Sequence, residues 1–298
     1  MKGPLFPSAL HRSTGECDLK VLRWAWQSGL FESHAELERF RVEKINWFAG
    51  FLYPEIDAEK LTLVMQFFLG LFLLDDLLDQ DPSLSHMDYL ESLSRSSMNK
   101  DKGRKERIGN RLLELKEKLK NSFPEENSKR EWEGSWKEYL NGLQWEIRNK
   151  IEGKIPDLED YKYFRPYSSG VFLAIQLART KKHFKNCETG ILESTIARYI
   201  CLSNDLVSLS KEKKANDFYN ELIILQASFG RDAEAIAKKE LGVLEKKIVS
   251  LSRLVTENDE SCQTWINRLL HLVGGCLAWS AMTVRYFSPV NGKPTLLT

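Results

Sequence analysis

The 298-residue sequence has little that marks a secreted or nucleic-acid-binding protein. Its five cysteines are scattered with no close pair, which argues against a disulfide framework or a zinc site and predicts reduced thiols in a cytoplasmic protein. Its 43 Lys and Arg residues nearly balance 42 Asp and Glu residues, so the basic excess of a nucleic-acid surface is lacking. No long apolar core near the N-terminus resembles a signal peptide.

The best candidate for a membrane span is also too short. The run LTLVMQFFLGLFLL covers residues 61–74, contains Thr62 and Gln66, and continues into three aspartates. A membrane-spanning helix needs about 20 apolar residues. We therefore expect no membrane span here, but a buried core helix.

Strand signals are weak and prolines are few, whereas helical periodicity extends along the whole chain. No internal repeat, low-complexity linker or shift in composition marks a domain boundary. We therefore predict one all-α domain over residues 1–298, a helical bundle with flexible tails at about 1–16 and 289–298. The predicted helices cover residues 17–30, 35–52, 58–79, 87–97, 104–122, 128–150, 158–181, 188–213, 216–228, 232–256 and 260–287.

An acidic cluster follows the most apolar run, in the stretch FLLDDLLDQDP at residues 72–82. On a helix, Asp75 and Asp79 lie about 40° apart, and Asp76 lies within about 100° of both. Carboxylates this close repel one another, and a hard cation such as Mg²⁺ would relieve the repulsion. Taken alone, the cluster fits a metal site and a solvated helix end equally well. Asp81 lies about 240° from Asp75, so helical phase favours Asp79 as the outer ligand.

A second set of oxygen donors lies in the stretch YICLSNDLVSLSKEKK. Asn204, Ser208 and Glu212 are spaced i, i+4 and i+8 on one helical line, and apolar residues, including Ile200, precede them on it. Amide, hydroxyl and carboxylate oxygens suit Mg²⁺, whereas zinc would favour His and Cys. Two oxygen-rich sites on two buried helices therefore predict a shared metal cluster of several ions.

These motifs resemble those of class I terpene synthases of the microbial, single-domain type. DDLLD resembles the family's aspartate-rich motif, and NDLVSLSKE (204–212) resembles its second metal motif. YKYFRPYSSG (161–170) resembles the segment whose arginine senses diphosphate, and WSAMTVRY (279–286) resembles the C-terminal Trp and Arg-Tyr pair. NEL (220–222) resembles the start of a family helix. The order and spacing fit from about residue 20 to 288.

The resemblance implies an α-helical bundle around a deep apolar pocket, with Mg²⁺-dependent ionisation and cyclisation of a linear prenyl diphosphate. It implies three Mg²⁺ ions, for which Mn²⁺ would substitute, in a monomer or homodimer. Asp76 more often supports such a site without contacting metal. The implied metal ligands are Asp75, Asp76, Asp79, Asn204, Ser208 and Glu212. The implied diphosphate contacts are Arg165, Lys211, Arg285 and the hydroxyl of Tyr286.

The pocket would shield a carbocation from water, and aromatic faces do this by cation–π attraction. The candidate lining residues are Phe68, Leu71, Phe72, Ser169, Ile200 and Trp279. Core packing explains each of these aromatics as well as pocket lining does. We interpret Trp132, Trp136 and Tyr139, on one face of a charged helix, as core.

Farnesyl diphosphate is the favoured substrate, because Phe72 and Trp279 would shorten the pocket. Geranylgeranyl diphosphate, and hence a diterpene synthase, is the alternative. A prenyl-chain elongating transferase or a squalene-synthase-like enzyme would need a second aspartate-rich motif, and that position here reads Asn-Asp-x-x-Ser. A non-catalytic helical scaffold would be expected to lose motif residues, and none is missing. A protein that binds a prenyl diphosphate without ionising it is a further alternative, which an assay of turnover distinguishes.

Overall fold

The computed structural model describes residues 6–80, 83–96, 103–179, 187–230, 232–258 and 262–286. Thirteen α-helices and no β-strand lie within these ranges, which confirms the all-α prediction. Asp81 and the expected tail at 289–298 lie outside them. Cys17, Cys201 and Cys276 are free thiols, as predicted.

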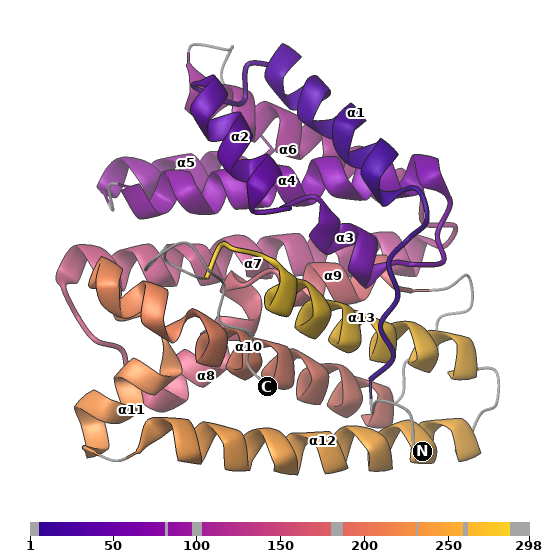
Figure 1. Ribbon diagram of the computed structural model, residues 1–298, viewed down its shortest axis with the longest axis vertical. Coiled ribbons are helices and arrows are strands. Elements are labelled where there is room, and N and C mark those ends of the chain that lie inside the picture. Colours follow the sequence, from indigo (N-terminus) through magenta and orange to yellow (C-terminus); the bar gives the residue numbers. More distant parts are fainter. Residues whose placement is uncertain are drawn as a thin grey trace.

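The helices follow one another along the chain in an order shown in Figure 1. Their bounds are α1 (Thr14–Gln27), α2 (His34–Val42), α3 (Trp47–Leu52), α4 (Ala58–Gln80), α5 (Leu84–Ser94), α6 (Arg104–Asn121), α7 (Glu126–Glu152), α8 (Leu158–Ser168), α9 (Val171–Leu177), α10 (Cys187–Ala215), α11 (Glu221–Phe229), α12 (Ala233–Asn258) and α13 (Gln263–Met282).

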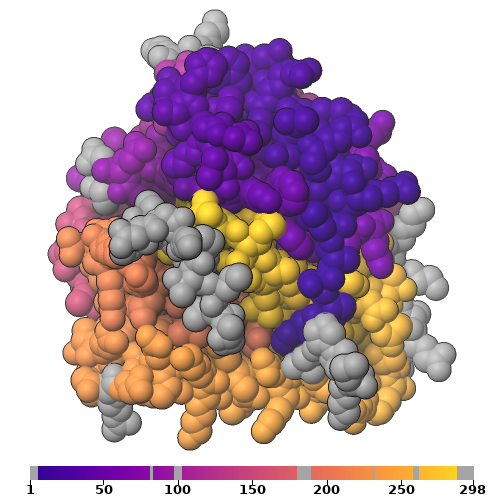
Figure 2. Space-filling view, in the orientation of Figure 1, coloured from indigo at the N-terminus to yellow at the C-terminus, as the bar shows by residue number. Residues whose placement is uncertain are grey.

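The long helices α4, α7, α10, α12 and α13 run across the molecule in roughly one direction (Figure 1). Helix α4 packs on α1, α3 and α6, and α7 packs on α5, α8 and α9. Helix α10 contacts α13 and α9 on its inner side, while α12 covers its outer side. Figure 2 shows the end of α13 and the residues after it lying between the N-terminal helices and α10–α12. Segments far apart in the sequence therefore meet near the C-terminal segment.

Helix α4 is buried on several faces because neighbours surround it. Its buried residues include Leu61, Phe67, Phe68 and Leu74. Within the described ranges it is the one helix long and apolar enough to meet the length and composition of a membrane span, and 61% of that window is buried inside the protein. This burial fits the predicted core helix.

Two predicted helices are each divided in the structure. The stretch 35–52 forms α2 and α3, because the backbone turns at Lys44, which has a left-handed φ of 53°. The stretch 158–181 forms α8 and α9, because Gly170 has a φ of 71°, a conformation that glycine adopts without strain. Apolar periodicity continues across both breaks because the two halves pack on the same core, so the pattern alone did not reveal them.

Several other helix boundaries also differ from the prediction. Helix α1 begins at Thr14, inside the stretch expected to be a flexible tail, and α11 begins only at Glu221. Helix α13 ends at Met282, and Thr283 has an extended ψ of 142°. Thr283 and Tyr286 therefore lie beyond the helix, although the predicted helix at 260–287 included both.

Candidate active site

A cavity of about 630 Å³ lies between α4, α7, α9, α10 and α13. The lining residues of α4 change along the chain from apolar Phe68, Leu71 and Phe72 to acidic Asp75 and Asp79. On α10, lining residues likewise change from apolar Ile200 to the polar second motif. The polar residues of α4 and α10 lie near the same end of the cavity, as the contacts below show. The cavity therefore has an apolar end and a polar end.

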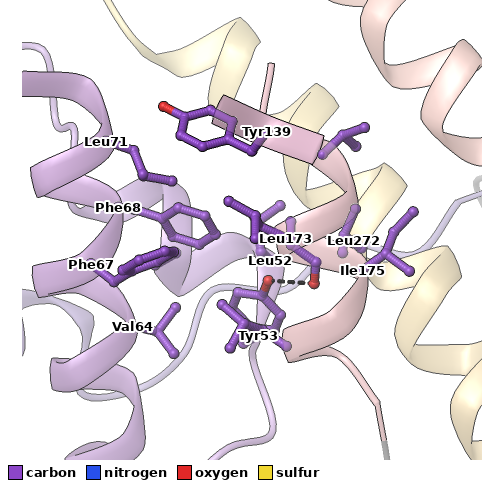
Figure 3. Close-up of a cluster of buried hydrophobic side chains, with 14 of the residues drawn as sticks. Leu52, Tyr53, Val64, Phe67, Phe68, Leu71, Tyr139, Leu173, Ile175 and Leu272 are labelled. Carbon is purple, nitrogen blue, oxygen red and sulfur yellow. Dashed lines mark hydrogen bonds between the residues drawn. The ribbon is translucent and has the colours of Figure 1, made fainter. Parts of the chain in front are cut away.

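All six predicted pocket residues line this cavity. Figure 3 shows Phe68 and Leu71 on α4 facing the space in front of Leu173 on α9. Phe48 of α3, which sequence reasoning missed, joins the aromatic wall: its ring centroid lies 5.5 Å from that of Phe68 and 4.9 Å from that of Trp279. Its periodicity is that of any core residue, so no signal distinguished it.

Tyr139 lines the cavity too, and its interpretation as core was incomplete. Trp132 and Trp136 do belong to the core, where both pack on Phe67 with ring centroids 5.4 and 6.1 Å away. Tyr139, one turn further along α7, points its ring toward Leu71 (Figure 3). Burial raises the pKa of its phenol well above the ordinary value, so the hydroxyl stays neutral.

The three aspartates of the first motif take different partners. Asp76 accepts hydrogen bonds from Arg39 at 2.6 Å and from Arg285 at 2.9 Å. Asp79 accepts one from Lys150 at 2.6 Å. Asp75 lies 3.7 Å from the Arg285 guanidinium, which is too far for a hydrogen bond. Asp76 therefore anchors arginines, while Asp75 keeps its oxygens turned to the cavity.

The pKa values of these carboxyls follow from their partners. Burial, reinforced by the nearby charge of Asp79, raises the pKa of Asp75 to about 7. Half of the Asp75 side chain is accessible (51%), but the accessible part faces a cavity enclosed by protein. For Asp76, burial acts to raise the pKa, but Arg285 and Arg39 together lower it. Asp76 is thus ionised and holds both arginines. The raised pKa of Asp75 indicates that nearby cations compensate its negative charge only in part.

The second motif is held by a residue outside it. Asn220 begins α11, where its side-chain oxygen accepts a hydrogen bond from the Leu222 amide at 2.8 Å. Its amide nitrogen donates to Glu212 at 2.5 Å and to Ser208 at 3.5 Å. Burial, and next the charge of Asp205, raise the pKa of Glu212 to about 7. Asn220 therefore orients two of the three predicted ligands.

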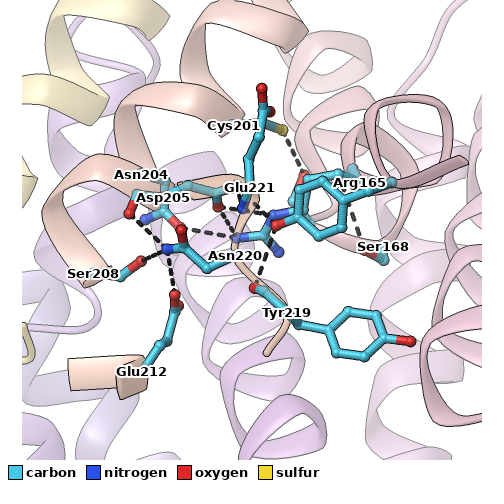
Figure 4. A network of polar contacts seen from close by, with 12 residues as sticks. Arg165, Ser168, Cys201, Asn204, Asp205, Ser208, Glu212, Tyr219, Asn220 and Glu221 are labelled. Carbon is cyan, nitrogen blue, oxygen red and sulfur yellow. Dashed lines mark hydrogen bonds and ion pairs between the residues drawn. The ribbon is translucent and has the colours of Figure 1, made fainter. Parts of the chain in front are cut away.

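Arg165 of α8 reaches the same network (Figure 4). It donates to the side-chain oxygen of Asn204 at 3.0 Å and to Asp205 at 2.9 and 3.2 Å. Asp205 is buried and also accepts from the Tyr161 hydroxyl at 2.8 Å. No role was predicted for Asp205. The sequence feature that could have indicated one is its position in NDLVSLSKE, next to the predicted ligand Asn204.

The position of Arg165 depends on the break between α8 and α9. Helix α8 ends at Ser168, and Ser169 and Gly170 line the cavity at the turn. A Cβ on Gly142 of α7 would lie 2.6 Å from the Ser168 backbone nitrogen. Only glycine lets the two backbones approach this closely. Pro166 stays within α8 despite its missing amide hydrogen.

The C-terminal segment joins the two motifs. The side-chain nitrogen of Asn204 donates to the Tyr286 hydroxyl at 2.8 Å, while Arg285 contacts Asp75 and Asp76. Arg285 also donates to Glu43 at 3.0 Å. The backbone between Trp279 and Arg285 is tied to the turn after α2, because the Trp279 indole donates to the Lys44 carbonyl at 2.8 Å. Lys211 lines the cavity as well.

The donor set suits a hard divalent cation. Within the described ranges, no three His, Cys, Asp or Glu side chains already converge on one point. Mg²⁺, however, is commonly held by one or two carboxylates together with substrate phosphates. Asp75 and Glu212 are cavity-lining carboxyls with raised pKa values, and Asn204 and Ser208 add neutral oxygens. These residues fit such an ion, whereas the carboxylate of Asp76 is already paired with two arginines.

An apolar, aromatic cavity that ends in carboxylates and guanidinium groups has the chemistry to hold a divalent cation and an organic diphosphate. The family model described as terpene synthase family 2, C-terminal metal binding, matches residues 66–244. The chain belongs to this family and is a class I terpene synthase of the microbial type, which confirms the resemblance read from the motifs.

Known relatives match along nearly the whole chain. The 4-epi-cubebol synthase of Streptosporangium roseum is 23% identical, with 94% of this chain and 88% of the relative covered. The germacrene A synthase of Nostoc punctiforme is 24% identical, with 94% and 93% covered. Among solved structures, a linalool/nerolidol synthase from Streptomyces clavuligerus has a TM-score of 0.82 at 13% identity, covering 94% of this chain and 100% of that one. At this identity the structural likeness shows the fold alone.

Proposed function

We propose that the protein ionises a linear prenyl diphosphate, farnesyl diphosphate, in a Mg²⁺-dependent reaction and cyclises the cation to a sesquiterpene hydrocarbon or alcohol. The observation that carries this proposal is the two-ended cavity. Its aromatic walls suit a carbocation, and its polar end gathers oxygen donors and guanidinium groups suited to a diphosphate. The breaking C–O bond would therefore lie where these two environments meet.

The cationic side chains would stabilise the charge of the leaving diphosphate. Arg165, Arg285 and Lys211 line the polar end, and the Tyr286 hydroxyl adds a neutral donor. The two guanidinium groups are held by carboxylates in advance, so little reorganisation is needed when charge develops. Bound Mg²⁺ would add Lewis-acid stabilisation of the diphosphate oxygens. We propose Asp75, Asn204, Ser208 and Glu212 as its principal ligands, with Asp79 joining them.

The walls would then protect the cation. Phe48, Phe68, Phe72 and Trp279 have mutual ring-centroid distances between 4.9 and 5.9 Å where they pair, so they form a continuous aromatic surface. Such a surface stabilises positive charge without acting as a nucleophile. The neutral Tyr139 hydroxyl is a polar group on α7 beside this surface. Changes at these positions are expected to alter the product mixture more than the rate.

The names of the relatives support a fifteen-carbon substrate. The Streptosporangium roseum relative is described as farnesyl diphosphate cyclizing, and the other relative makes germacrene A. The exact product, the number of metal ions, the monomer or homodimer state and the cytoplasmic location stay predictions.

The direct test is a product assay. Purified protein is incubated with farnesyl or geranylgeranyl diphosphate, with Mg²⁺, with Mn²⁺ or with EDTA, and diphosphate release and extracted hydrocarbons are measured. We expect cyclic fifteen-carbon products that require the metal. Asp75→Asn should lower turnover at least about 100-fold while the circular dichroism spectrum is retained.

Other outcomes would identify the alternatives. Twenty-carbon products from geranylgeranyl diphosphate alone would identify a diterpene synthase. A longer prenyl diphosphate, formed when isopentenyl diphosphate is supplied as the second substrate, would identify an elongating transferase. Folded protein that releases no diphosphate from either substrate would contradict the proposal.

A further inference from the structure

Lys150 of α7 lies among three carboxylates at the polar end of the cavity. Its ammonium nitrogen is 2.6 Å from Asp79, 3.0 Å from Glu146 and 3.5 Å from Asp217. It also lies over the Tyr219 ring, 5.1 Å from the centroid. Only 11% of the Lys150 side chain is exposed. No motif of the sequence analysis contains this lysine, yet it lines the same cavity as the metal motifs.

The surroundings keep Lys150 charged. Burial by itself would lower the pKa of its amine, but Glu146, Asp79 and Asp217 together raise that pKa well above its ordinary value. Its three partners come from three segments: the end of α4, α7 itself, and the turn after α10. Lys150 therefore connects the aspartate motif to the segment that follows the second metal motif.

The partners of Lys150 differ in how easily they can leave it. Glu146 is one helical turn earlier on α7, so it stays close to Lys150 when other segments move. Asp79 is 45% exposed and is the penultimate residue of α4, so its side chain has room to turn. Asp76, by contrast, is only 15% exposed and is held by two arginines. Of the two aspartates in the first motif that accept hydrogen bonds from basic side chains, Asp79 is therefore the one that can be released.

We propose that Lys150 is a positioning residue that serves as the internal counter-ion of Asp79 in the metal-free enzyme and yields Asp79 to an incoming divalent cation. The exchange is inexpensive because Lys150 keeps Glu146 and Asp217 and is never left as a buried unpaired charge. This inference rests on the divalent cation of the proposed function. It adds that the affinity of the site for metal is set by competition with a lysine on a third helix.

Competition of this kind has a direct consequence. Removing the ammonium leaves Asp79, Glu146 and Asp217 at one end of the cavity without the cation that they share. Mutual repulsion should then destabilise the metal-free protein. The same unmet negative charge should bind a divalent cation more tightly than the wild type does. A lysine with a purely structural role would lower stability without raising metal affinity.

The test titrates metal-free protein with MgCl₂ in the absence of substrate, and follows the thermal unfolding midpoint and calorimetric heat. Lys150→Met should melt below the wild type in EDTA, and MgCl₂ should recover most of the difference. Its half-saturating Mg²⁺ concentration should be at least about tenfold lower than that of the wild type. Lys150→Arg, which keeps the charge, and Lys154→Met, an exposed lysine just beyond the same helix, should stay close to the wild type.

A second variant covers the case in which Lys150→Met does not fold. Asp217→Asn removes one competitor for the ammonium, so Lys150 should hold Asp79 more firmly and the half-saturating Mg²⁺ concentration should rise. Unchanged or weaker Mg²⁺ binding by folded Lys150→Met, or unchanged binding by Asp217→Asn, would overturn the proposal. None of these readouts needs turnover. A protein that behaves as expected here but fails to convert farnesyl diphosphate would refute the proposed function and leave the role of Lys150 standing.

Discussion

Replacing Asp205 with asparagine probes the network that holds Arg165. One carboxylate oxygen of Asp205 accepts both hydrogen bonds from the Arg165 guanidinium, at 2.9 and 3.2 Å. The other accepts from the Tyr161 hydroxyl at 2.8 Å and from the Glu221 backbone amide at 3.2 Å. In Asp205→Asn, the new NH₂ group must face either the guanidinium or that backbone N–H. One buried donor is therefore left without an acceptor in both orientations.

The size of the loss follows from burial. The Asp205 side chain is 1% exposed and that of Arg165 is 16% exposed, so water replaces little of the lost interaction. An unsatisfied buried donor costs about 1–3 kcal/mol, and removing one partner of a buried ion pair costs about 3–5 kcal/mol in total. We expect the free energy of unfolding to fall by about 3–5 kcal/mol in Asp205→Asn.

Urea unfolding followed by circular dichroism measures this change on metal-free protein. Asp88→Asn, at an exposed position on α5, is the matched control and should stay within about 0.5 kcal/mol of the wild type. A loss in Asp205→Asn no larger than that of the control would refute the reasoning, because Arg165 would then not depend on the carboxylate for its position.

Two further predictions concern pH and packing. Burial raises the pKa of Asp75 and of Glu212 to about 7, so both carboxyls hold protons below that pH. Mg²⁺ binding should therefore weaken as the pH falls through 7, and it should release protons that calorimetry can measure. Because of these raised pKa values, the metal-free native state binds more protons than the unfolded chain between about pH 4.5 and pH 7. Its free energy of unfolding should therefore decrease as the pH rises over that range. An increase would contradict the raised pKa values. Gly142→Ala should destabilise the protein by about 1–3 kcal/mol and weaken diphosphate binding, because its Cβ would lie 2.6 Å from the Ser168 backbone nitrogen and displace the end of α8. Gly134→Ala, on the same helix with nothing within 4 Å of the added Cβ, should be neutral or stabilising in the same thermal unfolding assay.

Much of the site could be predicted from local patterns. The spacing of Asn204, Ser208 and Glu212 puts their oxygens on one side of a helix, whatever that helix packs against. Likewise Phe68 and Asp75 share a line on α4, so an apolar wall leading to an acidic end was predictable. Helical periodicity is a property of neighbouring residues, which is why it needs no knowledge of the rest of the chain.

The breaks within helices were harder to predict. The turn at Gly170 separates α8 from α9, yet apolar residues continue in helical register on both sides of it. The turn exists because the backbone of α8 ends against Gly142, a residue of another helix. A contact between segments so far apart leaves no periodic trace in either of them.

The sequence by itself determined that the chain is helical and that two of its helices carry oxygen donors along one side. It did so because helix geometry and the chemistry of side chains act over a few residues. Only the tertiary structure decided which charges meet. It paired Asp76 with Arg39 and Arg285, Asp79 with Lys150, and Asp205 with Arg165. Ion pairs depend on distance in space, and three helices that are remote in sequence set those distances together.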